Sequence, residues 1–427
     1  MEIIVQKIKK RVLQGFETFA QYVFITLELF NKHGLANHAA AGAYGFLFSA
    51  APALLIVSFF VSQVLRSSPE TAVELVGQMG LLSQAFDMRH LTKTFLSESQ
   101  HGLAGLISVI GLLWTARIFA LCLQRGLGII FPDTEKIKPV KKMVTSILIE
   151  IAIILFTFIM VFSSEAAFLM YHVIGILSLN HNVSMVLSLL IPLMALSLFI
   201  FLGYTFVPAI ISKQKAAIIG TSFCVGSFMI VFLMSHIIFN PEKYDVLYGT
   251  LGNLLVLLVN VYFFFMLFFL GAELTFIVHY FDALLLSRFI NLSTDEGKTA
   301  LNKRWFTSTS GALKKYVNVY EKGKVVFHKG EKNRDVYYIL EGEAGVYLEE
   351  NKRVATIQVG KFFGEMGHVL SEGRSATIKA HKNDLKVLVI PPDLFQDVLK
   401  FSSDADQKVI TVLSERLKSV NEKLSGQ

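Results

Sequence analysis

A short segment near the C-terminus combines residue types that suit the binding of an anion. The string Gly364-Glu365-Met366-Gly367 is followed closely by Arg374-Ser375-Ala376. A guanidinium presents paired donors to two phosphate oxygens, so Arg374 is the expected charge partner of such a ligand. Gly364 allows the backbone to approach the ligand closely, and backbone N–H groups near the start of a short helix also favour an anion. These residues predict a phosphate-binding site.

Short alternating strands surround this segment and must position it. From about residue 314 the hydrophobic pattern has a period of two, interrupted by glycine-containing turns at 329–331, 341–343 and 359–361. The expected strands are 316–320, 324–328, 335–340, 343–348, 353–357, 375–380 and 385–390. Helices are expected at 393–400, after Pro391-Pro392, and at about 403–424. Many short strands with glycine turns predict a C-terminal β-roll with flanking helices.

The segment and its strands together resemble the phosphate-binding cassette of cyclic-nucleotide-binding domains. The upstream frame of Phe327, Gly330, Tyr338 to Gly342, and Gly360 fits as well, and the resemblance covers about 314–424. It implies that Glu365 accepts the ribose 2′-hydroxyl and that Ser375 and Ala376 donate to the phosphate. The implied site comprises Gly364, Glu365, Met366, Arg374, Ser375 and Ala376. Its ligand would be cAMP or cGMP, and Ser375 slightly favours cAMP. A domain that has lost its ligand is the alternative, but such domains usually lack the arginine or the glutamate.

The composition of the rest of the chain is that of a membrane protein. The 427 residues are 53% hydrophobic and only 17% charged, whereas about 25% charged is usual for soluble domains. A span needs about 20 mostly apolar residues. The candidate spans are 39–65, 103–130, 143–170, 184–209, 215–239 and 247–279. We therefore predict an α-helical polytopic membrane domain of about six transmembrane helices. The expected divisions are a cytoplasmic amphipathic segment at 1–36, the membrane domain at 37–285, a linker at 286–312 and the nucleotide-binding domain at 313–427.

Basic residues alternate between the loops and predict the orientation. The N-terminal segment and the loops 131–142 and 210–214 are rich in lysine or arginine, and the intervening loops are poor or mixed. The positive-inside rule then places both termini in the cytoplasm. The net charge of +7 fits contact with anionic lipid. Residues 14–32 read as an amphipathic helix at the interface, with a seventh span as the competing interpretation. We expect no cleavable signal peptide, because 1–15 lack a continuous apolar core.

Polar residues within the predicted spans are candidates for function, since they are costly in lipid. They are Arg117, Gln124, Arg125, Glu150, Asn253, Asn260 and Glu273. Two ion pairs are hypotheses: Arg125 with Glu273, and Arg117 with Glu150. Such pairs either fix helix packing or line a path for a substrate. Asn253 and Asn260 lie seven residues apart on one face, which favours helix contact over pore lining.

Several strings in the apolar half resemble the YihY/BrkB family of bacterial inner-membrane proteins. They are Ala39 to Tyr44 with Ser49 to Pro52, Leu113 to Arg117 with Gln124-Arg125, Tyr204 with Pro208, Tyr248 to Thr250, and Gly271 to Leu274. The resemblance covers roughly 15–285 and implies six helices with both termini in the cytoplasm. Some members carry an old label as a ribonuclease. A metal nuclease needs clustered histidine and carboxylate ligands, and this sequence has no such cluster. We therefore predict no catalytic residues, metal, cofactor or enzyme activity.

Joined together, the two halves predict a transporter-like or envelope-related inner-membrane protein regulated by a cyclic nucleotide. The alternatives are a non-transporting scaffold or envelope-biogenesis protein and, third, a cyclic-nucleotide-gated channel. A channel needs a selectivity filter or a re-entrant pore segment, and no TVGYG-like string occurs. A DNA-binding regulator needs a helix-turn-helix region after the β-roll. The sequence shows none, so we expect cyclic nucleotide and lipid as partners, and no nucleic acid.

Overall fold

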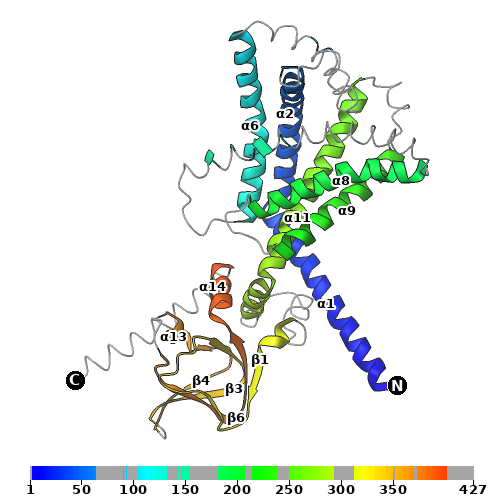
Figure 1. Cartoon of the computed structure of the whole chain (residues 1–427). Helices are drawn as coiled ribbons and strands as arrows, with labels where there is room; N and C mark the ends of the chain where they lie inside the picture. Colours follow the sequence, from blue (N-terminus) through cyan, green and yellow to red (C-terminus); the bar gives the residue numbers. More distant parts are fainter. Residues whose placement is uncertain are drawn as a thin grey trace. The chain divides into compact units, whose positions relative to one another are not determined.

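A computed structural model provides the structure of the chain, and it divides into two compact units. One comprises residues 1–25 and 280–427, and the other 26–279. Apart from a few isolated positions between 90 and 155, the residues described are 2–63, 103–131, 181–206, 214–238, 250–292, 312–349, 352–369 and 373–401. The long helices and the β-roll are both visible in Figure 1.

Among the described residues, five long apolar helices match predicted spans. They are α2 (Leu35–Gln63), α6 (Leu103–Ile130), α8 (His181–Phe206), α9 (Gln214–Ile238) and α11 (Thr250–Leu292). By length and composition, three stretches of the described residues could cross a membrane: Leu35–Ile56, Gln214–Ser235 and Leu254–Leu292. Large apolar side chains such as Trp114, Met194 and Phe206 lie exposed on these helices, as expected for surfaces that face lipid. The remaining predicted span, 143–170, falls almost entirely outside the described residues.

The helices α9 and α11 cross with their backbones in contact. A Cβ atom added to Gly220 of α9 would overlap the Thr275 hydroxyl and lie 2.5 Å from the Gly271 carbonyl oxygen of α11. Tyr204 of α8 donates a hydrogen bond of 2.6 Å to the Phe268 carbonyl, and Thr275 donates one of 2.9 Å to the Gly271 carbonyl. Small residues at the crossing and hydroxyls bonded to backbone are the usual means of packing helices in lipid.

The N-terminal segment forms a single helix, α1 (Glu2–Lys32). Phe16, Phe19, Val23 and Leu27 are exposed along it, and their spacing of three and four residues places them on one face. Gln21 and Ile25 are buried. The predicted amphipathic character of 14–32 is therefore present, and its location at the membrane interface remains a prediction.

The last apolar helix is longer than the sequence suggested. We placed the end of the span at 279 and the start of a polar linker at 286, whereas α11 continues to Leu292. The reason is a second apolar stripe beyond the span: Leu285, Leu286, Phe289, Ile290 and Leu292 are all buried. The helix has one non-helical residue, Tyr280, with φ −106° and ψ 17°.

The C-terminal domain is a six-stranded antiparallel sheet with the order β1-β6-β3-β4, in which β2 pairs with β6 and β5 with β3. Its strands are β1 (Val317–Tyr320), β2 (Val325–Phe327), β3 (Val336–Glu349), β4 (Lys352–Ile357), β5 (Phe362–Phe363) and β6 (Thr377–Ile390). A 3-10 turn, η1 (Ala312–Tyr316), precedes them. The short helix α13 (Glu365–Val369) follows β5, and α14 (Pro392–Phe401) follows β6. The predicted helix at 403–424 lies outside the described residues.

Two pairs of predicted strands are each one continuous strand. We expected a turn at 341–343, but β3 passes through it with a shifted register between Ile339 and Glu343. Gly342 there has φ +88°, and an added Cβ would collide with the Asp384 carbonyl oxygen of the neighbouring β6. Lys382 of β6 also has a positive φ, +61°. The glycine therefore produces a bend shared by two paired strands, which curls the sheet into a roll.

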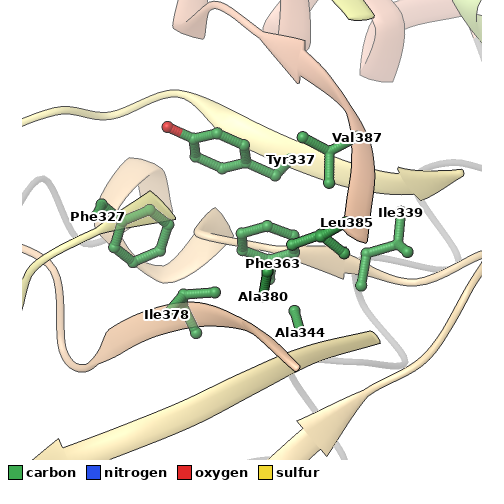
Figure 2. Close-up of a cluster of buried hydrophobic side chains, with 9 residues drawn as sticks. All are labelled: Phe327, Tyr337, Ile339, Ala344, Phe363, Ile378, Ala380, Leu385 and Val387. Carbon is green, nitrogen blue, oxygen red and sulfur yellow. The ribbon is translucent and has the colours of Figure 1, made fainter. Parts of the chain in front are cut away.

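The core of the roll lies between the strands that flank the candidate ligand segment. It consists of Phe327, Tyr337, Ile339, Ala344, Phe363, Ile378, Ala380, Leu385 and Val387, drawn in Figure 2. The rings of Tyr337 and Phe363 are stacked with their centroids 4.9 Å apart. Because Tyr337 is the second residue of β3 and Phe363 the last of β5, this packing fixes the position of Gly364, which follows β5.

Candidate nucleotide-binding site

Arg374 lies in the interior of the roll and holds two distant segments together. Its side chain is only 2% exposed. One terminal nitrogen, Nη1, donates a 2.7 Å hydrogen bond to the Gly364 carbonyl, and Nη2 donates a 2.7 Å bond to the Asp335 carbonyl. Gly364 lies between β5 and α13, and Asp335 directly precedes β3. The arginine backbone pairs with Gly330 and Glu331 at 2.8 and 3.0 Å. Arg374 is therefore held by the protein both at its guanidinium and at its backbone.

Two aromatic rings support the guanidinium. Its central carbon lies 4.1 Å from the ring centroid of Phe327 and 5.6 Å from that of Tyr337. A cation over an aromatic face is stabilised by the ring quadrupole, most strongly where water is excluded. The sequence places Phe327 in the frame of the domain only, and nothing in it distinguishes Tyr337 from other core residues. Both lie in short apolar runs, which marks them as core, and only the fold shows that they support the arginine.

The buried charge of Arg374 is incompletely balanced by the protein. Among the described residues no carboxylate forms a salt bridge with it. Burial lowers the pKa of Arg374, and Tyr337, Asp335, Glu331 and Glu365 act in the opposite direction. The guanidinium nevertheless stays charged in proteins. A buried cation of this kind is stabilised by an anionic ligand.

The guanidinium also has donors left for such a ligand. It carries five N–H groups, and the bonds to the Gly364 and Asp335 carbonyls use one each. The Nε atom is buried and makes no hydrogen bond within the part of the chain that is described. A group with Nε–H and further terminal N–H donors can bind two phosphate oxygens while keeping its two backbone partners.

Glycine is required at position 364 for two reasons. Its φ is +82°, and an added Cβ would lie 2.6 Å from Nη1 of Arg374 and 3.0 Å from the Asp335 carbonyl oxygen. The positive φ directs the chain from β5 into α13, and the missing side chain leaves space for the guanidinium. The predicted role of Gly364 in close approach thus concerns the arginine as well as a ligand.

The other predicted site residues lie around Arg374. Glu365 is the first residue of α13 and is 1% exposed, and Met366 beside it is half-buried. Ser375 is exposed, whereas Ala376 is buried. The fold therefore brings Gly364, Glu365 and Arg374 together around one position. The contacts expected of Ser375 and Ala376 with a phosphate remain predictions.

Glu273 in the membrane-spanning helix α11 has a different partner from the one predicted. It is fully buried, and its Oε2 lies 3.0 Å from Nδ1 of His33. The hypothesis of a pair with Arg125 is wrong, because Arg125 is exposed and forms no salt bridge with Glu273 among the described residues. His33 directly follows the first helix, which ends at Lys32, and is itself followed by Gly34 with φ +62°. The tight corner before α2 turns this histidine toward Glu273, which a count along one helix cannot reveal.

The remaining intramembrane candidates do not form a cluster in the described structure. Arg117 is half-buried beside the Trp114 ring, 5.8 Å from its centroid. Asn260 donates 2.9 Å to the Val256 carbonyl of its own helix. Gln124 is half-buried, and the surroundings of the Asn253 side chain are outside the description. Glu150 also lies outside it, together with its hypothetical pair with Arg117. A search of the described residues shows no group of side chains that could hold a metal ion.

Comparison with known proteins assigns both halves of the chain. The family model described as "Virulence factor BrkB" matches residues 26–285, and the model for the cyclic nucleotide-binding domain matches 317–401. The first is a family of membrane proteins and the second a regulatory domain. Neither is typically catalytic.

Individual relatives resemble only the C-terminal part. The cAMP-activated global transcriptional regulator CRP of Salmonella typhimurium is 29% identical over 128 residues, covering 29% of this chain and 58% of the relative. Human cGMP-dependent protein kinase 2 is 28% identical over 88 residues, 19% of this chain and 12% of the kinase. Among solved structures, the Thermus thermophilus catabolite activator protein matches 26% of this chain and 53% of its own, with 19% identity and a TM-score of 0.24. The chain thus spans little more than half of the length of the CRP regulator, and far less of the kinase.

The two family models match separate regions. The membrane match covers more than half of the sequence, and the regulatory match begins after the last apolar helix. The site built around Arg374, Gly364 and Glu365 lies within the second match. The chain therefore belongs to the virulence factor BrkB family of membrane proteins and carries a C-terminal cyclic nucleotide-binding domain.

Proposed function

We propose that this protein is a transporter-like component of the bacterial inner membrane whose activity is regulated by cAMP or cGMP. Both termini lie in the cytoplasm in this proposal, because the loops on that side carry the excess of lysine and arginine. One observation carries the regulatory part. Arg374 is buried, held by two backbone carbonyls and supported by Phe327, yet keeps donors for an anion.

A cyclic nucleotide fits the chemistry of the residues around Arg374. Its phosphate carries one negative charge and would accept bonds from the guanidinium, the Ser375 hydroxyl and nearby backbone N–H groups. Glu365, at the start of α13 next to Gly364, would accept a hydrogen bond from the ribose 2′-hydroxyl. The similar proteins include a cAMP-activated regulator and a cGMP-dependent kinase, which supports this ligand class and leaves both bases as candidates.

Regulation would follow from linkage. If the nucleotide binds one conformation of the roll more tightly than another, it shifts the equilibrium of the whole chain by that difference in affinity. The membrane domain would then favour one of its own conformations. No chemistry on the nucleotide is needed, which agrees with the expectation that the protein is not an enzyme.

The transport part of the proposal is tested by reconstitution. Full-length protein in proteoliposomes would be supplied with a panel of inorganic ions and small organic solutes, and flux measured with and without saturating cAMP or cGMP. A flux that changes with nucleotide and is absent from empty liposomes supports a regulated transporter. Nucleotide binding without flux of any solute in the panel favours the scaffold alternative.

Gly364→Ala tests the geometry of the site at a single atom. The new Cβ would press on Arg374 Nη1 and occupy a residue with φ +82°. Because such strain costs about 1–3 kcal/mol, we expect nucleotide affinity to fall by roughly tenfold or more, at ~1.4 kcal/mol per factor of ten. Calorimetry of the full-length protein in detergent measures this loss.

Gly323→Ala is the matched control for this experiment. Gly323 has nearly the same backbone angle, φ +81°, but no atom lies within 4 Å of an added Cβ. The control therefore adds the same backbone strain without the contact with the arginine. Equal losses of affinity in the two variants would show that the close approach of residue 364 to Arg374 has no role in binding.

A further inference from the structure

The end of the last membrane helix is built into the nucleotide-binding unit. We define the α11 tail as residues Tyr280–Leu292, which belong to the same compact unit as the β-roll. A helix of 43 residues is roughly 64 Å long at 1.5 Å per residue. A bilayer core is about 30 Å thick, so a spanning α11 must continue well beyond the lipid. The tail is therefore available for contact with the roll.

Three contacts join the tail to three parts of the roll. The Asp282 carboxylate accepts hydrogen bonds from Lys315 Nζ at 2.7 Å and from the Tyr316 hydroxyl at 2.9 Å, both in η1. The Phe289 ring lies 6.3 Å from the Tyr338 ring of β3, edge to face. Tyr280 packs in the same way on Phe401 at the end of α14, at 4.9 Å.

Of these three contacts, the one between Phe289 and Tyr338 connects the tail with residues next to the ligand site. Phe289 and Tyr338 are both buried, 6% and 2% exposed. Tyr338 packs against Phe362 of β5 at 5.0 Å between ring centroids. Phe362 lies two residues before Gly364, and Tyr338 lies three residues after Asp335. Those are the two residues whose carbonyls Arg374 holds. Any shift of the guanidinium toward a ligand acts on both of these segments, and Phe289 packs on Tyr338, where the two segments meet.

The helix is interrupted at the N-terminal end of the tail. Tyr280 has φ −106° and ψ 17°, outside the helical range. A residue in this sparsely populated region interrupts the regular helix, so the tail can change direction there while the rest of α11 keeps its own. The same residue contacts α14 through its ring. The break and the docking contacts thus lie on one short segment.

We propose that the α11 tail is the element through which the nucleotide domain acts on the membrane helices: a nucleotide on Arg374 tightens the packing of Phe289 on Tyr338 and reorients the tail at Tyr280. This inference rests on the proposed function, since it needs a nucleotide at the site. Reciprocity then requires that loosening the tail weakens nucleotide binding. The effect of the nucleotide need not pass along the linker between the tail and η1. The ion pair of Asp282 in the tail with Lys315 in η1 connects these two elements directly.

Hydrogen–deuterium exchange of the full-length protein in nanodiscs tests this, with calorimetry on the same samples. Exchange of amides in 280–292 should slow by about fivefold or more on saturation with cAMP, the lower limit of typical coupling. In Phe289→Ala the slowing should be lost, while cAMP still binds with an affinity reduced by a similar factor. Asp282→Asn should lose part of the slowing. This second variant keeps the test decisive if Phe289→Ala does not fold.

Phe281→Ala is the matched control. Phe281 is 6% exposed, like Phe289, and stacks on Tyr22 of α1 with centroids 3.9 Å apart. The same side chain is removed from the same tail, but away from the roll, so the response to cAMP should persist. A wild-type protein that binds cAMP without any change in 280–292 overturns the inference, as does full slowing in Phe289→Ala. A wild-type protein that binds no cyclic nucleotide instead refutes the proposed function, and the inference falls with it.

Discussion

Replacing Arg374 with alanine should weaken the binding of cAMP and cGMP by more than an order of magnitude. The substitution removes the only group in the described site that is both cationic and buried, together with its bonds to Gly364 and Asp335. Truncating one partner of a buried, hydrogen-bonded charge pair costs about 2–5 kcal/mol. That corresponds to an affinity loss of roughly thirtyfold to several thousandfold. Calorimetry of the full-length protein with each nucleotide measures it.

Arg374→Lys separates charge from geometry. A lysine keeps the positive charge, but its compact ammonium cannot reach two carbonyls and a phosphate with fixed, planar donors. We therefore expect it to bind nucleotide far more weakly than the wild type. Full affinity in Arg374→Lys would show that charge alone recognises the ligand.

Arg353→Ala controls for the loss of one arginine from the domain. Arg353 is exposed on β4, and its guanidinium contacts the ring of His381. Its removal leaves the Arg374 site intact, so affinity should be unchanged. If Arg374→Ala binds nucleotide as well as Arg353→Ala does, the proposed ligand site is wrong.

The second large effect is expected in the membrane domain, where Gly220→Val should prevent close packing of α9 and α11. Even a single Cβ at this position overlaps Thr275 and approaches the Gly271 carbonyl to 2.5 Å. Backbone atoms cannot move aside without separating the helices, and overpacking typically costs about 1–3 kcal/mol, occasionally more. We expect a lower yield and a lower melting temperature in detergent. The melting temperature is measured as the temperature at which heating removes the monodisperse peak on size-exclusion chromatography.

Gly226→Val on the same helix provides the comparison. No atom lies within 4 Å of an added Cβ at Gly226, so the substitution changes only local helix propensity, by a few tenths of a kcal/mol. The two variants carry the same residue change on the same helix. If the two variants have the same melting temperature, the crossing at Gly220 does not stabilise the domain.

Local sequence determined the elements and the chemistry of the ligand site. Runs of apolar residues at 103–130 and 215–239 predicted α6 and α9 to within one residue at each end, because a span must be apolar over its whole length. Alternation and turn glycines predicted β1, β2 and β4, since side chains alternate between the faces of a strand. The residue types at positions 364, 365 and 374, which are glycine, glutamate and arginine, were enough to indicate an anion-binding site.

Turn chemistry was less reliable, and Gly342 shows why. A glycine between two apolar runs indicates a turn, and here it permits a bend in one long strand. The distinction depends on Asp384 and its neighbours in β6, 42 positions along the chain from Gly342. No pattern within a short window contains that information.

The partners of the functional side chains were decided by tertiary structure alone. Arg374 bonds to the Asp335 carbonyl 39 residues away, and Glu273 meets His33 across 240 residues. A backbone carbonyl carries no signature in the residue type that bears it, and a contact between distant segments depends on how elements pack. The sequence by itself determined which residues could bind an anion and which stretches could cross a membrane. Only the folded chain decided that aromatic rings and two carbonyls hold the guanidinium, and that the end of α11 packs on β3, because long-range packing selects partners that local periodicity does not encode.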